Sequence, residues 1–223
     1  YQDRSIRKEI KTALPQINIP IIVERNAVCD ITYFNMLKKH KEDSILVSGC
    51  FGLSAAVLLD GQILHGRSGN IGELGHIQIE GNSLICRCGR TGCLETITGG
   101  IAWNKRWTDF RKPNKKLPIL FSDALKTGNT NALSILMEGI DMLFPILSNL
   151  LILFVPECLI LYLDIPENVV TKTKERLIFN LDKNHIKPRP DIEIATGNQV
   201  SSIGAALVGF KHLCGNPHYE IKE

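Results

Sequence analysis

The sequence lacks a strong net charge, a long uninterrupted apolar run and any internal repeat, and each absence excludes a class of protein. Its 223 residues carry a formal net charge of only +3, which is too small to indicate nucleic-acid affinity. Residues 142–163 form the most apolar stretch but contain Pro145, Pro156 and Glu157. A membrane span needs about 20 apolar residues, so this stretch is predicted to be a helix ending before Pro156, followed by a strand.

No charged-then-apolar leader opens the sequence, and its cysteines number seven. An odd number, three of them in one cluster, favours a reducing cytoplasm. The hydrophobic content of 44% is sufficient for one sizeable core or for two lobes that share an interface. The cysteines outside the cluster are expected to be apolar core thiols: Cys29, Cys50, Cys158 and Cys214.

One histidine and three cysteines are concentrated in a single short segment, and their spacing predicts a metal site. His76, Cys86, Cys88 and Cys93 lie within 18 residues, with Gly89 and Gly92 providing sharp turns. Zn²⁺ binds one imidazole and three thiolates tetrahedrally, and four protein ligands leave no position for reactive water. We therefore predict a structural zinc in the loop of residues 76–95. The alternatives are unpaired buried cysteines, or disulfides in an exported protein.

The remaining pattern predicts an α/β protein in which strands and helices alternate near the carboxyl end. Predicted strands cover residues 20–23, 44–48, 54–59, 62–65, 158–163 and 192–195. Predicted helices cover residues 3–14, 31–39, 122–125, 130–154, 169–181 and 201–212, with Thr130 or Asn131 as the cap of the longest. That longest helix also offers apolar surface for a dimer contact, although core packing is the favoured use.

Three motifs together resemble the ROK family, which includes repressors, open reading frames and sugar kinases. They are GELGH at residues 72–76, CRCGRTGCLE at residues 86–95 and SIGAA at residues 202–206. The resemblance implies an actin-like, ribonuclease-H-like fold. It implies most of a carboxy-terminal lobe in residues 21–223 and only part of an amino-terminal lobe in residues 1–20.

The resemblance also implies a sugar site beside the zinc loop. At the matching positions, Glu73, His76 and Glu95 would hydrogen-bond sugar hydroxyls. Carboxylates accept hydroxyl protons, and a metal-bound imidazole holds its second nitrogen in a fixed direction. The competing interpretation for Glu73 and Glu95 is a solvated surface charge, and for His76 metal ligation outranks sugar contact.

The groups that a ROK kinase needs for phosphoryl transfer are replaced. Asn26 stands at the position of the family's catalytic aspartate, and an amide cannot accept the proton, although it can bind a sugar or cap the following helix. Residues 50–54 read CFGLS where ROK kinases have GTGIG, and backbone amides that approach phosphate need glycine. The double glycine near the adenosine site is replaced by residues 161–164, and the first phosphate loop has no match before Ile21.

These features predict the sugar-sensing effector domain of a NagC/XylR-type ROK transcriptional regulator. It would be a cytoplasmic homo-oligomer that binds a sugar or amino sugar, contacts DNA only through a segment absent from this sequence, and has no membrane association. The alternatives are a divergent ATP-dependent ROK kinase of a hexose or N-acetylhexosamine, and a degenerate product without a stable fold.

Overall fold

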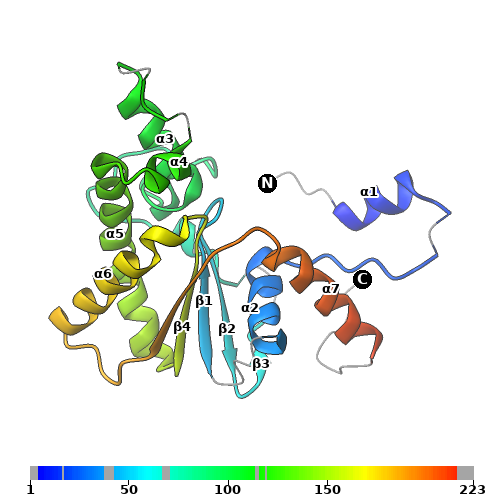
Figure 1. Ribbon diagram of the computed structural model, residues 1–223. Helices are drawn as coiled ribbons and strands as arrows, with labels where there is room; N and C mark the ends of the chain where they lie inside the picture. Colours follow the sequence, from blue (N-terminus) through cyan, green and yellow to red (C-terminus); the bar gives the residue numbers. More distant parts are fainter. Residues whose placement is uncertain are drawn as a thin grey trace.

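The structure, a computed structural model, describes residues 5–16, 18–37, 43–66, 71–113, 116–118 and 120–214. Seven α-helices and five strands are present in these residues (Figure 1). The helices are α1 (Ile6–Ala13), α2 (Asn26–Leu37), α3 (Gly100–Arg111), α4 (Phe121–Lys126), α5 (Thr130–Phe154), α6 (Val170–Lys183) and α7 (Val200–Leu213). The strands are β1 (Ser44–Ser48), β2 (Ser54–Leu59), β3 (Gln62–Ile63), β4 (Cys158–Tyr162) and β5 (Asp191–Ala195).

One mixed sheet organises the chain, with strand order β3-β2-β1-β4-β5. Strands β1, β4 and β5 are parallel, whereas β2 and β3 pair antiparallel. All five residues of β1 and of β4 are buried, because both faces of these central strands are covered. The carboxyl ends of the parallel strands meet at one edge of the sheet, where ligands usually bind in α/β folds.

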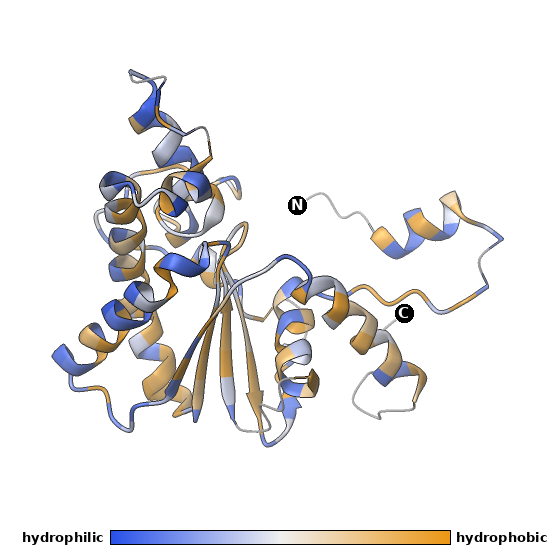
Figure 2. Cartoon of the chain, in the orientation of Figure 1, coloured by the Kyte–Doolittle hydropathy of each residue, from blue (hydrophilic) through white to orange (hydrophobic). Residues whose placement is uncertain are grey.

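Two helical layers cover the sheet, each with its own apolar core. Helices α2 and α7 lie on one face, while α5 and α6 lie on the other, with α3 and α4 above them (Figure 1). The strands are predominantly apolar, whereas polar residues lie along the outer faces of α5 and α6 (Figure 2). Helix α7 approaches α2 closely at Gly204, where an added Cβ would lie 1.9 Å from the Cys29 carbonyl oxygen. Only glycine fits this crossing.

Helix α5 spans 25 residues and is the one described helix that is long and apolar enough to cross a membrane by length and composition. One face packs into the core through Leu136, Leu143 and Leu147 among others. The helix ends at Phe154, before Pro156, as predicted. Its cap is Asn129, whose side chain accepts two backbone N–H groups, and not Thr130 or Asn131.

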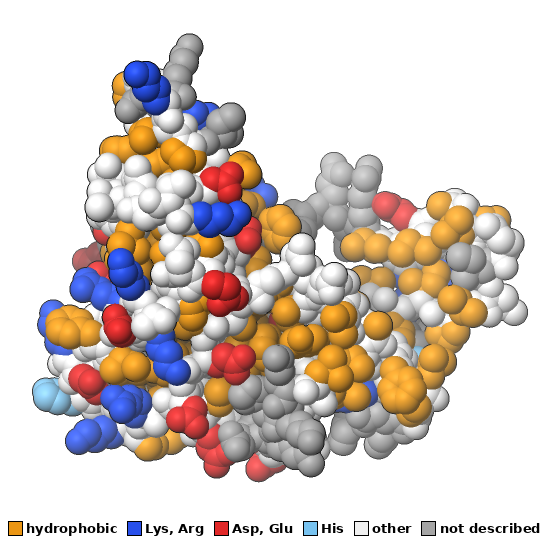
Figure 3. All heavy atoms as spheres, in the orientation of Figure 1, with side chains coloured by type: hydrophobic (Ala, Val, Ile, Leu, Met, Phe, Trp, Pro, Cys, Tyr) orange, Lys and Arg blue, Asp and Glu red, His pale blue; other side chains and the backbone are white. Residues whose placement is uncertain are grey.

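The segment before α2 differs from the prediction. Residues 20–23 form no strand, because no described strand lies beside them to supply hydrogen-bond partners. Helix α1 has no buried residue and stands away from the sheet (Figure 1). Exposed apolar side chains gather over this segment and the adjoining α7 (Figure 3). They include Ile19, Val23, Phe210 and Leu213.

Other element boundaries also differ. Helix α2 begins at Asn26 and not at residue 31, because the Arg25 carbonyl already accepts helical hydrogen bonds from Val28 and Cys29. Strand β3 has two residues where four were predicted. Helix α3 was not predicted at all. Residues 3–4 and 38–39, the outer ends of two predicted helices, lie outside the described residues.

Candidate functional site

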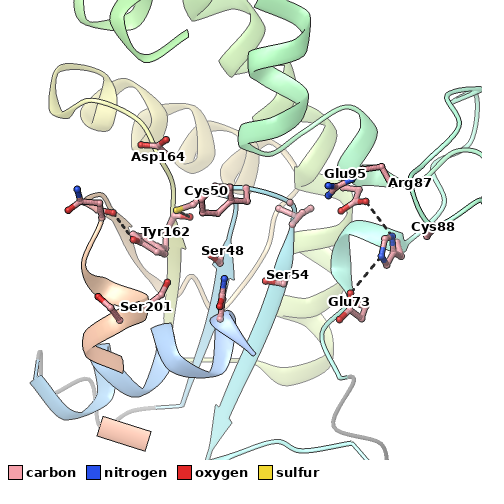
Figure 4. Close-up of a pocket in the computed structure, with 18 residues that line it drawn as sticks. Ser48, Cys50, Ser54, Glu73, Arg87, Cys88, Glu95, Tyr162, Asp164 and Ser201 are labelled. Carbon is pink, nitrogen blue, oxygen red and sulfur yellow. Dashed lines mark hydrogen bonds and ion pairs between the residues drawn. The ribbon is translucent and has the colours of Figure 1, made fainter. Parts of the chain in front are cut away.

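A cavity of about 750 Å³ opens at the carboxyl edge of the sheet. Its volume falls in the ~300–1,000 Å³ range of small-molecule sites. Glu73, Arg87, Cys88 and Glu95 lie on one side of it, and Tyr162, Asp164 and Ser201 on the other (Figure 4). We call these sides the cysteine half and the strand-end half. Between them lie side chains from the end of β1, the β1–β2 connection and the start of β2, among them Ser48, Cys50 and Ser54.

The predicted metal ligands converge in the cysteine half. One ligand atom from each of His76, Cys86, Cys88 and Cys93 lies within 4.8 Å of all the others. The sulfurs of Cys88 and Cys93 are 3.7 Å apart, and the Cys86 sulfur is 3.8 Å from Nδ1 of His76. Tetrahedral Zn–S bonds of ~2.3 Å place two sulfurs ~3.8 Å apart, so this donor set fits a zinc ion.

Tight backbone turns bring the ligands together. Gly72 has φ +81°, and an added Cβ would lie 2.0 Å from the Ala55 carbonyl oxygen, so the loop can run against β2 only with glycine there.

Hydrogen bonding from the backbone and side chain of Arg90 lowers the pKa of Cys88 to about 6. The thiolate is the form that binds metal, so the loop favours it at Cys88, whereas burial raises the pKa of Cys86 to about 12 and also raises the pKa of Cys93.

His76 connects the cysteine cluster to the cavity. Its Nδ1 faces Cys86 and lies 3.7 Å from Oε1 of Glu95, while its Nε2 lies 3.8 Å from Oε2 of Glu73. Binding a metal through Nδ1 leaves Nε2 directed toward the carboxylate side of the cavity. Glu73 also faces Nε of Arg25 at 3.6 Å. These groups offer both hydrogen-bond donors and acceptors.

The residue predicted to stand in place of the family's catalytic aspartate, Asn26, lies at the cavity wall. Asn26 is the first residue of α2 and lines the cavity together with Glu73, His76 and Glu95. The four residues predicted to contact sugar are therefore brought to one cavity.

The loop between β1 and β2 carries the residues predicted to replace the phosphate loop of ROK kinases, with Phe51 in place of its threonine. Phe51 lines the cavity with 72% of its surface exposed. Burial raises the pKa of the neighbouring Cys50 thiol to about 12, so this thiol stays protonated at neutral pH.

A buried acid beneath the strand-end half was not predicted from the sequence. Asp30 of α2 has 0% of its surface exposed, and burial raises its pKa to about 6 despite hydrogen bonding by Ser201 and Ser48. The Ser201 hydroxyl donates to Oδ1 at 2.5 Å, and Oδ2 has no hydrogen-bond partner among the described residues. The available signal was one aspartate in the otherwise apolar stretch AVCDI.

Comparisons with known proteins find relatives of two kinds. A model of the ROK family matches residues 5–208. The DNA-binding transcriptional dual regulator NagC of Escherichia coli is 42% identical over 82 residues, which make up 37% of this chain and only 20% of that protein. A glucokinase of Pyrobaculum calidifontis is 25% identical over 203 residues, covering 89% of this chain and 68% of that protein.

Among solved structures, the ROK hexokinase from Thermus thermophilus is similar with a TM-score of 0.71 and 24% identity. The similarity covers 94% of this chain and 70% of that chain. A similarity at this identity establishes the fold, which is actin-like and ribonuclease-H-like, and leaves the activity to be argued from the cavity.

Proposed function

This chain belongs to the ROK family, and we propose that it is the sugar-sensing effector domain of a ROK transcriptional regulator, stabilised by zinc and without phosphoryl transfer. One observation carries the proposal. The cavity keeps polar groups suited to sugar hydroxyls around the cysteine cluster, whereas Asn26 stands where a kinase needs a carboxylate, and Cys50 and Phe51 stand where it has glycine and threonine.

Zinc would be held by His76, Cys86, Cys88 and Cys93. The donor set supports this assignment, because its sulfur and nitrogen spacings suit tetrahedral coordination. The ion would cross-link parts of the loop that backbone hydrogen bonds also join, among them those from Ile79 to the Gly92 carbonyl and from Leu94 to the Ile77 carbonyl. It would thereby fix the direction of the His76 ring beside Glu73 and Glu95.

A sugar would lie against Glu73, His76, Glu95 and Asn26. The side chain of Glu95 is only 12% exposed, so a hydrogen bond from a hydroxyl to its carboxylate would form largely out of water. Glu73 is more exposed and its Oε1 faces Arg25, which orients the carboxylate. Sensing would require that the sugar binds two states of the protein with different affinity.

The absence of phosphoryl transfer is supported by what replaces the phosphate machinery. Phosphoryl transfer needs a base for the attacking hydroxyl and close backbone contact with phosphate oxygens. The Asn26 amide cannot act as that base, and the Phe51 ring occupies space at the turn between β1 and β2.

The alternative is a divergent ATP-dependent sugar kinase. The similarity to the Pyrobaculum glucokinase over 89% of this chain favours it, whereas the higher identity to NagC over 82 residues favours the regulator. As a regulator, the chain would act as a cytoplasmic homo-oligomer and would contact DNA only through residues outside this sequence. The division into lobes at about residue 20 stays a prediction.

A thermal-shift screen tests the proposal directly. Hexoses and amino sugars are added with and without ATP and magnesium, and those that stabilise the protein enter a coupled assay of ADP release. Stabilisation by a sugar without ADP release is the expected result. ADP release at rates typical of enzymes, about 1 s⁻¹ or faster, would establish the kinase instead.

A further inference from the structure

Three hydroxyl groups in the strand-end half donate their hydrogen bonds to other groups of the protein. The Ser201 hydroxyl donates to buried Asp30, and the Ser202 hydroxyl donates to the Gln199 carbonyl oxygen at 3.0 Å. The Tyr162 hydroxyl donates to the Gly197 carbonyl oxygen at 2.6 Å. A hydroxyl has one proton, so toward the cavity each of these oxygens can only accept a hydrogen bond.

The same half of the cavity is negatively charged. Asp164 lines it, and among the described residues its carboxylate makes no hydrogen bond or ion pair. Asp30 lies beneath the lining residues, and its Oδ2 has no hydrogen-bond partner within the described part of the chain. Burial raises the pKa of Cys50 and of Tyr162 at this end, and both carboxylates add to the increase. The one lysine or arginine that lines the described cavity is Arg87, in the cysteine half (Figure 4).

The start of helix α7 opposes this charge but does not cancel it. Its first backbone N–H groups are free donors and carry roughly half a positive charge in total. Asp164 and the ionised form of Asp30 carry whole negative charges. The balance at this end is therefore negative, although the whole chain has a formal net charge of +3.

From these observations we propose that the strand-end half binds a primary ammonium group of the ligand. An ammonium has three donors and no acceptor, which complements the three accepting hydroxyl oxygens, the carboxylate of Asp164 and the side-chain oxygen of Asn198, whose amide also lines this half. Phosphate, which offers acceptors only, is disfavoured at the same place. This inference rests on the proposed sugar site. The ligand is then a sugar with hydroxyls at the cysteine half and an amine at the other, and a cavity of about 750 Å³ has room for more than one hexose ring.

Binding of two disaccharides with the same linkage tests the proposal by isothermal titration near neutral pH. Cellobiose is neutral, and the β-1,4-linked disaccharide of glucosamine carries amines in place of two hydroxyls. We expect the diamine to bind ~10-fold more tightly, a difference of about 1.4 kcal/mol. Magnesium ATP is expected not to displace it.

Three variants locate the effect. Asp164→Asn should reduce the preference to below ~3-fold, because it removes the carboxylate that would pair with the ammonium. Asp30→Asn should also reduce it, since an amide can donate to Ser201 and release that hydroxyl's proton toward the cavity. Asp123→Asn alters an acid paired with Lys126 outside the cavity, and it should leave the preference unchanged.

Cellobiose binding as tightly as the diamine would overturn the ammonium site and leave the sugar site intact. An equal loss of preference in Asp123→Asn would also overturn it. Failure of both disaccharides and of every hexose in the thermal-shift screen would overturn the proposed function, and the ammonium site with it.

Discussion

The two halves of the cavity differ in how their polar groups are held. In the cysteine half, Glu73 and His76 lie at a short 3-10 helix outside the sheet, beside the cluster proposed to hold zinc. In the strand-end half, Tyr162 and Ser201 lie on a buried strand and a long helix, and Asp30 is covered completely. Under the proposed function, a metal would fix the geometry of one half, whereas the other obtains its geometry from the sheet and its helices.

Removing a sulfur should have the largest effect, and only in the cysteine half. We expect Cys88→Ser to lose the metal and to lower the free energy of unfolding by on the order of 4 kcal/mol, which is what a ligand at about a thousand times its Kd contributes. Elemental analysis and thermal melting measure both. Cys214→Ser, at an exposed cysteine outside the cluster, is the matched control and should keep the metal. Equal metal content in the two variants would contradict the assignment.

Neutralising the buried acid should affect the strand-end half in a pH-dependent way. The pKa of Asp30 rises from 3.8 to about 6 on folding, so its ionised form costs stability above about pH 6, and this cost disappears as the pH falls below 3.8. Asp30→Asn removes the cost. The unfolding free energy of the variant minus that of the wild type should therefore increase by about 3 kcal/mol between pH 3.8 and neutrality.

Denaturant unfolding across this pH range measures the difference. Neighbouring Cys50 and Tyr162 stay neutral there, since burial raises the pKa of both. The same subtraction for Asp123→Asn should lack this increase. A difference that does not change with pH would show that Asp30 is not the group that titrates.

A smaller effect separates sugar recognition from metal binding within the cysteine half. Glu73→Gln should weaken binding of a stabilising hexose by about 10-fold, because a charged acceptor becomes a neutral one, and it should leave the metal content unchanged. Glu80→Gln, at an exposed glutamate of the same loop, should change neither. If Glu73→Gln lost as much metal as Cys88→Ser, sugar recognition and metal binding would not be separate roles of this half.

The last prediction is that one substitution leaves ADP release absent. Restoring the carboxylate with Asn26→Asp should not produce ADP release with any hexose, because the loop at Phe51 still lacks the close backbone approach that phosphate needs. The coupled assay measures this. Sugar-dependent ADP release in this variant would show that a single amide blocks catalysis and that the strand-end half accepts nucleotide.

The sequence predicted features that depend on neighbouring residues and missed those that depend on distant ones. The cysteine cluster was predictable because its ligands lie within one short loop, and β1 and β4 were predictable from continuous apolar residues. Asp30 was not, since the serine that makes it significant lies 171 positions away. Residues 20–23 have the composition of a strand, but a strand also requires a neighbour to pair with.

Helices α2 and α7 are in direct backbone contact where they cross at Gly204, because the Cys29 carbonyl occupies the space that a side chain would need. The Ser201–Asp30 hydrogen bond joins them a second time. If a ligand displaces the start of α7, α2 should therefore move with it. This movement should also displace residues 18–25, which precede α2. Spin labels on α1 and α6 would measure that motion, and Gly204→Ala should reduce it. Unchanged label distances on adding a sugar would mean that the two helices serve only as a rigid wall.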